Sequence, residues 1–197
     1  ICSGALHLAL DGSSRRAIPE SNIPLGLVKG TAGITSANLF STQYVRQVNG
    51  WYESLKSSQE YDLMFRLWKA GAKFVTDLTP RAIIRKRQNG QISQRNPQEK
   101  WAQYIELRIE MLDYFGEDLI SKEDQNILYQ ELFIAVRTLA KSDINEATRY
   151  FLEYFKPFEF KPRSGTSNSW IYTFLFTILG FRRAEEIKQH TISLGNK

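Results

Sequence analysis

The 197-residue sequence contains one cysteine, Cys2, and two histidines, His7 and His190. A single cysteine excludes an internal disulfide and a cysteine-rich metal site. The two histidines are too few and too far apart in the chain for a zinc-binding pattern. The sequence also has no Gly-rich phosphate-binding loop and no Asp-x-Asp pair, so it predicts neither a P-loop nor a paired-aspartate metal site.

The net charge of +5 comes from the first half of the chain. Residues 1–99 contain 13 Lys and Arg against 7 Asp and Glu, whereas residues 100–197 contain 13 against 14. The stretch from Arg81 to Arg95 contains five basic residues and no acidic one. Such a stretch can meet the phosphates of a nucleotide, a lipid or a nucleic acid, and a solvated basic strand face explains it equally well.

Residues 57–71 have the pattern of a buried helix. Ser57 and Glu60 are spaced as a capping box, in which each side chain accepts a hydrogen bond from the other residue's amide. Gly71 suits a left-handed C-terminal cap. One apolar stripe of this helix contains Tyr61, Met64, Phe65 and Trp68.

The residues around this helix resemble a known signature. The sequence reads Gln59-Glu60-Tyr61-Asp62-Leu63, then Arg66-Leu67 and Lys69-Ala70-Gly71, preceded by Val48-Asn49-Gly50-Trp51-Tyr52-Glu53-Ser54-Leu55. This pattern resembles the acceptor side of the family 2 inverting glycosyltransferases, which have the GT-A fold. That family has a Gly-Gly-Phe-Asp-Glu-like turn, an acidic pair, Tyr-Asp-Leu and Arg-Leu. The resemblance covers residues 1–93 and is most specific over residues 48–71.

The resemblance implies a catalytic role for Glu60. In the family, the second acid of the acidic pair is the general base that deprotonates the acceptor hydroxyl, and it matches Glu60. Gln59 stands where the first acid is usual, and the base is Glu where Asp is more common. Asp62 is the second candidate for the base. A helix cap is the plain alternative for Glu60, because capping boxes are common.

The resemblance also implies acceptor-binding residues. Ser36 and Asn38 belong to a strand expected over residues 30–40, which borders the acceptor cavity in the family. The plain alternative for each is an ordinary polar residue of a strand. Trp51, Tyr52 and Glu53 are further acceptor-binding candidates, and the two aromatic rings can stack on a sugar face. Core packing is the alternative for Trp51.

Two residues within the basic stretch from Arg81 to Arg95 match the family's donor-diphosphate stretch. Arg87 corresponds to its arginine and can face a diphosphate. Gln88 replaces the histidine that helps to hold the metal or the diphosphate in the family. Metal contact is therefore not expected from this loop.

The substrates and cofactor implied by the resemblance are a nucleotide-sugar donor, a saccharide or lipid-linked acceptor, and a Mg or Mn ion on the donor diphosphate. Because the chain has no Asp-x-Asp motif, we expect the donor-binding half to be missing and this segment alone to be inactive. The opening without Met or a signal peptide also suggests a fragment of a longer protein. The implied setting is polysaccharide biosynthesis of the cell envelope, in the cytoplasm or peripherally on the inner face of the membrane.

The expected fold class is α/β, a partial GT-A-like mixed sheet with helices, followed by an α-helical C-terminal region. The expected division is an acceptor-side half over residues 1–95 and a helical region over residues 96–197. Strands are predicted over residues 1–10, 30–40, 73–76 and 81–87, with a break at Pro80. Helices of the second region are predicted over residues 96–116, 121–141 and 143–155.

Residues 170–181 are apolar on every side. At about 1.5 Å per residue, a helix there is about 18 Å long, which is short of the roughly 30 Å hydrocarbon core of a bilayer. The segment is therefore either a buried core helix or an interfacial membrane anchor.

A second hypothesis belongs to a different functional class. The chain can be a non-catalytic helical binding module that recognises an anionic partner through Arg81 to Arg95. The partner would be a phosphate, a lipid headgroup or a nucleic acid. No recognised RNA-binding or DNA-binding motif supports the nucleic acid, which is therefore not favoured.

Overall fold

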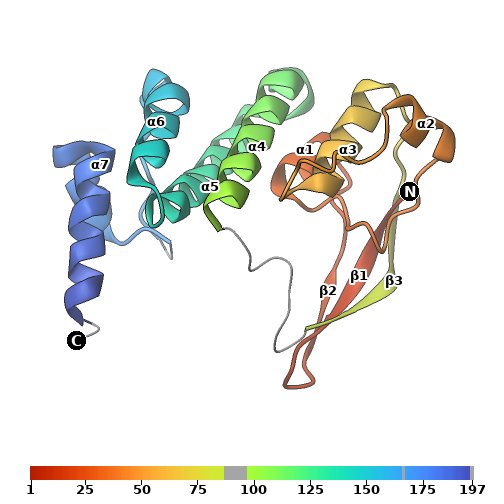
Figure 1. Cartoon of the computed structure of the whole chain (residues 1–197), viewed down its shortest axis with the longest axis horizontal. Coiled ribbons are helices and arrows are strands. Elements are labelled where there is room, and N and C mark those ends of the chain that lie inside the picture. Colours follow the sequence, from red (N-terminus) through yellow and green to blue (C-terminus); the bar gives the residue numbers. More distant parts are fainter. Residues whose placement is uncertain (87–96, 166, 196–197) are drawn as a thin grey trace.

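The computed structural model describes residues 1–86, 97–165 and 167–195. These residues form a three-stranded mixed sheet and seven α-helices. The sheet lies at one end of an elongated molecule, and the C-terminal helices lie at the other (Figure 1). The expected α/β class, followed by a helical region, is confirmed.

The sheet has the order β2-β1-β3. Strand β1 (Cys2–Leu8) pairs antiparallel with β2 (Ser14–Ala17) through a turn at residues 9–13, and parallel with β3 (Thr76–Arg85). The first predicted strand is therefore confirmed. Strand β2 was not predicted, because its residues are mostly exposed and polar and follow a turn signal.

The predicted break at Pro80 is wrong. Strand β3 runs through this proline instead of forming two strands over residues 73–76 and 81–87. Pro80 lies opposite Gly4, where the register with β1 shifts. A proline lacks the amide that a regular ladder needs, so an irregularity on an edge strand is where it is tolerated.

The strand predicted over residues 30–40 is also wrong. The structure has a loop there, with a turn in which the Ile34 carbonyl accepts hydrogen bonds from the amides of Ala37 and Asn38. The loop follows helix α1 (Ile23–Lys29), which ends at Gly30 in a left-handed conformation. Its far end meets the start of β1, where the Leu39 amide donates to the Ile1 carbonyl at 3.0 Å.

Helix α2 (Thr42–Gln47) and helix α3 (Gln59–Lys69) follow this loop. The predicted end of α3 is confirmed. Gly71 has a φ of +80°, and the amide of Ala72 donates to the Leu67 carbonyl at 3.0 Å. Such a pairing satisfies carbonyls that the helix leaves open. The buried side chains of α3 are Tyr61, Leu63, Met64, Phe65 and Leu67.

The second part of the chain consists of helices α4 (Pro97–Leu119), α5 (Lys122–Ala140), α6 (Ile144–Tyr154) and α7 (Trp170–Gly195), with a 3-10 turn η2 (Lys156–Phe158). The predicted starts of α5 and α6 are confirmed by their caps. The Ser121 hydroxyl accepts from the Asp124 amide at 3.1 Å, and the Asp143 carboxylate accepts from the Glu146 amide at 2.9 Å.

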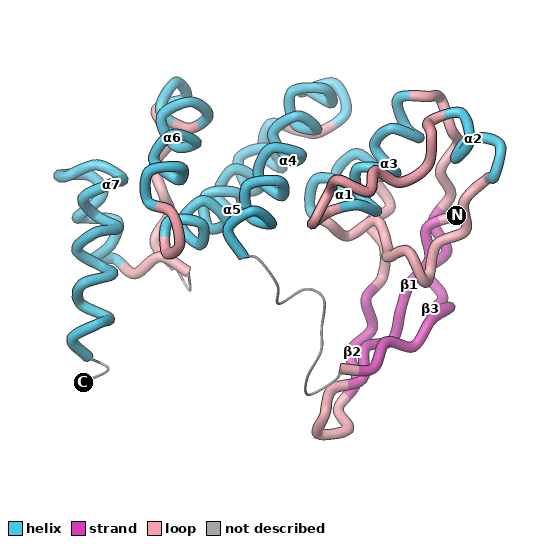
Figure 2. The backbone as a smooth tube through the Cα atoms, viewed as in Figure 1, coloured by secondary structure: helices cyan, strands magenta, loops and turns pink. Residues whose placement is uncertain are grey.

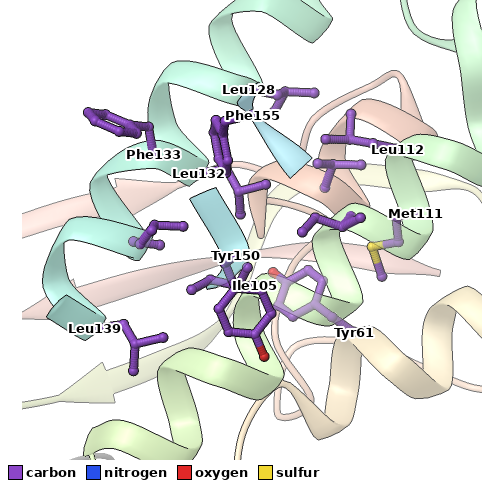
Figure 3. Packing of buried hydrophobic residues seen from close by; sticks show 14 of the residues in the cluster. Tyr61, Ile105, Met111, Leu112, Leu128, Leu132, Phe133, Leu139, Tyr150 and Phe155 are labelled. Atoms are coloured by element: carbon purple, nitrogen blue, oxygen red, sulfur yellow. The ribbon is translucent and has the colours of Figure 1, made fainter. Parts of the chain in front are cut away.

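One hydrophobic core joins the two parts of the chain. Side chains from α3, α4, α5 and α6 meet in a single cluster (Figure 3). Tyr61 of α3, Ile105 of α4 and Leu132 of α5 are each at most 6% exposed. The start of α3 is therefore held against the helical region by apolar packing.

Helix α7 buries only one side of its apolar segment. Tyr172 and Phe176 are buried, whereas Trp170, Phe174 and Ile178 are 71%, 59% and 61% exposed. Figure 2 shows α7 at the end of the molecule farthest from the sheet. Within the described residues, none of the helices combines the length and the hydropathy needed to cross a bilayer.

Candidate active site

The capping box predicted at the start of α3 does not form. The N-cap residue is Ser58 rather than Ser57, and it makes no side-chain cap. The Ser57 amide donates instead to Gln103 Oε1 at 3.1 Å, a contact made across from α4. The interpretation of Glu60 as a helix cap is therefore wrong.

Ser58 has an unusual backbone conformation. Its φ of +57° is in the left-handed region, where residues other than glycine and asparagine are uncommon. The Ser58 hydroxyl accepts a hydrogen bond from Arg108 Nη1 at 2.9 Å, which helps to hold this conformation. Residues held in such conformations cluster at functional sites.

The carboxylate of Glu60 has no partner in the part of the chain that the structure describes. Its side chain is half-buried in the first turn of α3. Among the residues that the structure describes, Glu60 has no hydrogen-bond or ion-pair partner. Its charge nevertheless acts on Arg108, whose protonated form it favours.

Arg108 of α4 is a buried cation behind this turn. It is 3% exposed, and its guanidinium lies 4.1 Å from the ring centroid of Tyr104 and 5.0 Å from that of Tyr61. Burial lowers the pKa of Arg108, whereas the two tyrosines and Glu60 raise it. Both Arg108 and the positive end of the α3 dipole favour negative charge at this place.

Asp62 has a structural partner. One of its oxygens accepts hydrogen bonds from Arg66 Nε and Nη2, at 2.9 and 2.6 Å. Glu60 and Asp62 are two residues apart on a helix, so their side chains point to different sides. Of the two predicted catalytic residues, Asp62 is in an ion pair with Arg66, whereas Glu60 has no ion-pair partner among the described residues.

Three predicted acceptor-binding residues gather on the turn before α3. Trp51 is 41% exposed, and its ring meets Phe40 edge to face at 5.8 Å. Tyr52 is 44% exposed, and the Arg66 guanidinium lies 3.9 Å from its ring centroid. Glu53 is exposed. These side chains form a polar and aromatic surface next to α3.

The other two predicted acceptor-binding residues differ from each other. Ser36 is exposed in the turn of the loop after α1. Asn38 is buried, and its side chain accepts from the Ser3 amide at 3.1 Å and donates to the Ala32 carbonyl at 3.3 Å. Asn38 therefore fixes the loop to β1 and has no group directed to a ligand.

Two adjoining hollows, which we call the sheet hollows, lie beside β1 and share His7 and Arg15. The first, of about 400 Å³, is bordered by the ends of all three strands, including Arg85 and Lys86. The second, of about 420 Å³, lies between the sheet and the loop that contains Gly33. The Gly33 carbonyl accepts a hydrogen bond from the Tyr61 hydroxyl at 2.8 Å, which connects this wall to α3.

Some of these residues were missed by the sequence analysis. Arg108 lies far from Ser58 in the chain, and no local pattern marks it. Arg15 and Arg16 follow a turn signal as a basic pair, which was the only available hint for the sheet hollows. Of the predicted donor residues, Arg87 and Gln88 lie outside the described residues.

The divalent cation implied by the resemblance has no ligand set in the described part of the chain, where no three His, Cys, Asp or Glu side chains are grouped to hold a metal. Comparisons of the chain with protein-family models, with curated proteins and with solved structures found no match.

Proposed function

We propose that this chain is the acceptor-side half, with its C-terminal helical region, of a family 2 inverting glycosyltransferase with the GT-A fold. The proposal rests on the resemblance around α3 and on one observation in the structure. That observation is the half-buried carboxylate of Glu60 in the first turn of α3, which has no partner among the described residues.

The reaction is a single displacement at the anomeric carbon of a nucleotide sugar. Glu60 accepts the proton of the acceptor hydroxyl, and the oxygen forms a bond to the anomeric carbon. The bond from that carbon to the diphosphate breaks, and the nucleoside diphosphate leaves with the bonding electrons. A carboxylate can act as such a base when it lies within hydrogen-bond reach of the hydroxyl.

The surroundings of Glu60 suit this role. A carboxylate without an ion-pair partner can accept a proton at no cost to such a pair, whereas protonation of Asp62 would neutralise its ion pair with Arg66. Trp51 and Tyr52 present partly exposed rings on the neighbouring turn, where a sugar face can stack. We therefore assign the acceptor side to α3 and the turn before it, with Glu53 and Ser36 as further polar contacts.

The donor side is proposed at the end of β3. Arg85 and Lys86 border the first sheet hollow there and directly precede Arg87 and Gln88. Cationic side chains in such a hollow can bind a diphosphate. Because the described residues provide no ligands for the divalent cation, no step of this reaction is assigned to it.

A transfer assay tests the proposal. The full-length protein that contains this chain is incubated with UDP-, GDP- and dTDP-sugars and a panel of saccharide and lipid-linked acceptors. We expect acceptor-dependent release of nucleoside diphosphate, and a product whose anomeric configuration is opposite to that of the donor. A retained configuration, or no release with any pair, would contradict the proposal.

A second candidate is a binding module for an anionic partner, and the first sheet hollow favours it. Arg15, Arg85 and Lys86 border this hollow, and no acidic residue does so among the described residues. Binding of a labelled single-stranded oligonucleotide by the isolated chain tests this candidate. A steep loss of affinity with salt, weakened further by Arg85→Gln, would support it, and no binding at low salt would remove it.

A further inference from the structure

Helices α5 and α7 are joined by long polar side chains. Arg137 Nε of α5 donates to Glu185 Oε1 of α7 at 2.5 Å, and both side chains are at most 6% exposed. Gln189 Nε2 of α7 donates to the Ala140 carbonyl at 2.9 Å. These contacts join the two helices, and a space lies beside them.

This space, which we call the helical hollow, has a volume of about 420 Å³. Its charged lining residues are Arg137, Lys141, Lys188 and Glu185, so three positive charges face one negative charge and the net charge is +2. Because Glu185 pairs with Arg137, the two lysines are left without a carboxylate. Neither has an ion-pair partner within the described ranges.

The cations in the helical hollow act on one another. Burial lowers the pKa of Lys188, and the positive charges of Arg137 and Lys141 lower it further, against the opposing effect of Glu185. Arg137 uses Nε for Glu185 and Nη1 for Ser167 and Asn168. Its Nη2 has no partner among the described residues. Hydrogen-bond donors of Arg137 and the two lysines are therefore available in a hollow whose positive charges outnumber its negative one.

A second observation concerns Tyr172, which lies against two cations of the helical hollow without lining it. Tyr172 of α7 is 3% exposed, and its hydroxyl has no hydrogen-bond partner in the described structure. The Arg137 guanidinium lies 3.6 Å from the Tyr172 ring centroid, and Lys188 Nζ lies 5.5 Å from it. A buried polar group without a partner calls for an explanation, and a bound water or ion is one of them.

We propose that the helical hollow binds a small dianion of the phosphomonoester class, held by Lys141, Lys188 and Arg137 Nη2. A phosphomonoester carries about −1.5 to −2 charges at neutral pH, which matches the net charge of the lining. The volume is in the range of small-molecule sites, about 300–1,000 Å³. This site is separate from Glu60 and does not depend on the proposed transferase activity.

The same phosphate can belong to a soluble molecule or to a lipid headgroup. The exposed apolar side of α7, with Trp170, Phe174 and Ile178, is compatible with the second source. The test therefore has two arms, both at low ionic strength. The first measures binding of inorganic phosphate and glycerol 3-phosphate by calorimetry. The second measures sedimentation with phosphatidylcholine vesicles, with and without phosphatidic acid.

Variants assign the binding to the hollow. Lys141→Gln and Lys188→Gln are each expected to weaken binding by about tenfold or more, as loss of a charge-assisted hydrogen bond does. Lys122→Gln, at a lysine of α5 that is 79% exposed, is the matched control and should leave binding unchanged. Circular dichroism checks that all three variants fold.

Loss of soluble-phosphate binding in the two hollow variants, with the control unaffected, would support a soluble ligand. The same loss seen only with phosphatidic acid vesicles would support a lipid source. No binding in either arm, or binding that all three variants reduce equally, would overturn the proposal.

Discussion

Arg66 donates two hydrogen bonds to a single oxygen of Asp62, from Nε at 2.9 Å and from Nη2 at 2.6 Å. The same guanidinium donates to the carbonyls of Val48 and Gly50, at 2.6 and 2.8 Å. Arg66 therefore ties helix α3 to the turn that carries the candidate acceptor-binding residues. Asp62 is part of this ion pair, whereas Glu60 is not.

Arg66→Met should destabilise the protein by about 2–4 kcal/mol, because a largely buried carboxylate and two carbonyls lose their donor. The side chains of Arg66 and Asp62 are only 12% and 15% exposed. Urea unfolding, followed by circular dichroism, measures the change. Arg149→Met is the control, since Arg149 is 48% exposed in its ion pairs, and it should cost at most about 1 kcal/mol. Equal losses in the two variants would contradict the role given to Arg66.

Gly33→Ala should be strongly destabilising. Gly33 has a φ of +86°, and a Cβ there would overlap Asn38 Oδ1 and lie 3.0 Å from the Ser3 carbonyl. We expect a loss of about 2–5 kcal/mol from the left-handed backbone and the overlap together. Gly12→Ala has a similar φ of +82° but no atom within 4 Å of its Cβ, so it should cost only about 1–2 kcal/mol. Thermal unfolding of the two variants makes the comparison, and similar losses would show that the close approach of Asn38 is unimportant.

The stability of the protein should fall at alkaline pH. Burial raises the pKa of Tyr61, Tyr150 and Tyr172 above the ordinary value of about 10. Each tyrosine stays protonated to a higher pH in the folded state than in the unfolded state. Its contribution to the free energy of unfolding is therefore fully present below the unfolded-state pKa, and it is lost as the pH rises through the folded-state pKa. Near-ultraviolet titration should show these three of the nine tyrosines ionising only on unfolding. Reversible ionisation of all nine near pH 10 would contradict this prediction.

Elements with local signals were predictable from the sequence. The caps at Ser121 and Asp143 and the glycine at Gly71 each fix a helix end through atoms of neighbouring residues. The apolar stripe of α3 correctly predicted its buried face. In each case the physical cause lies within a few residues of the element, so a single sequence contains it.

Features that depend on distant residues were not predictable. The loop over residues 30–40 is fixed by the Asn38 side chain, which contacts β1 and Met64 of α3. The capping box at Ser57 does not form, because the Ser57 amide donates to the side chain of Gln103 on another helix. Strand β3 continues through Pro80 because β1 accommodates an irregular register there. Tertiary partners overrode the local pattern in all three cases.

The candidate site was predicted only in part. Glu60, Trp51 and Tyr52 come from the resemblance, and the structure adds that Glu60 has no partner over residues 1–86, 97–165 and 167–195. Arg108 could not be inferred, because its relation to Ser58 spans 50 residues of sequence and exists only in the folded chain.

The transfer rate of a Glu60→Gln variant of the full-length protein is the most direct test of the account. Glutamine keeps the size of the side chain but cannot accept the proton, so we expect kcat to fall by about 10²–10⁴-fold, the usual contribution of a general base. The variant should stay folded and lose at most about 1 kcal/mol in urea unfolding, because Glu60 has no hydrogen-bond or ion-pair partner among the described residues and acts on Arg108 and the α3 dipole only through its charge. Glu131→Gln, at an exposed carboxylate on α5, is the control and should transfer at the normal rate. A Glu60→Gln variant that transfers at nearly the normal rate would contradict the assignment of Glu60 as the base.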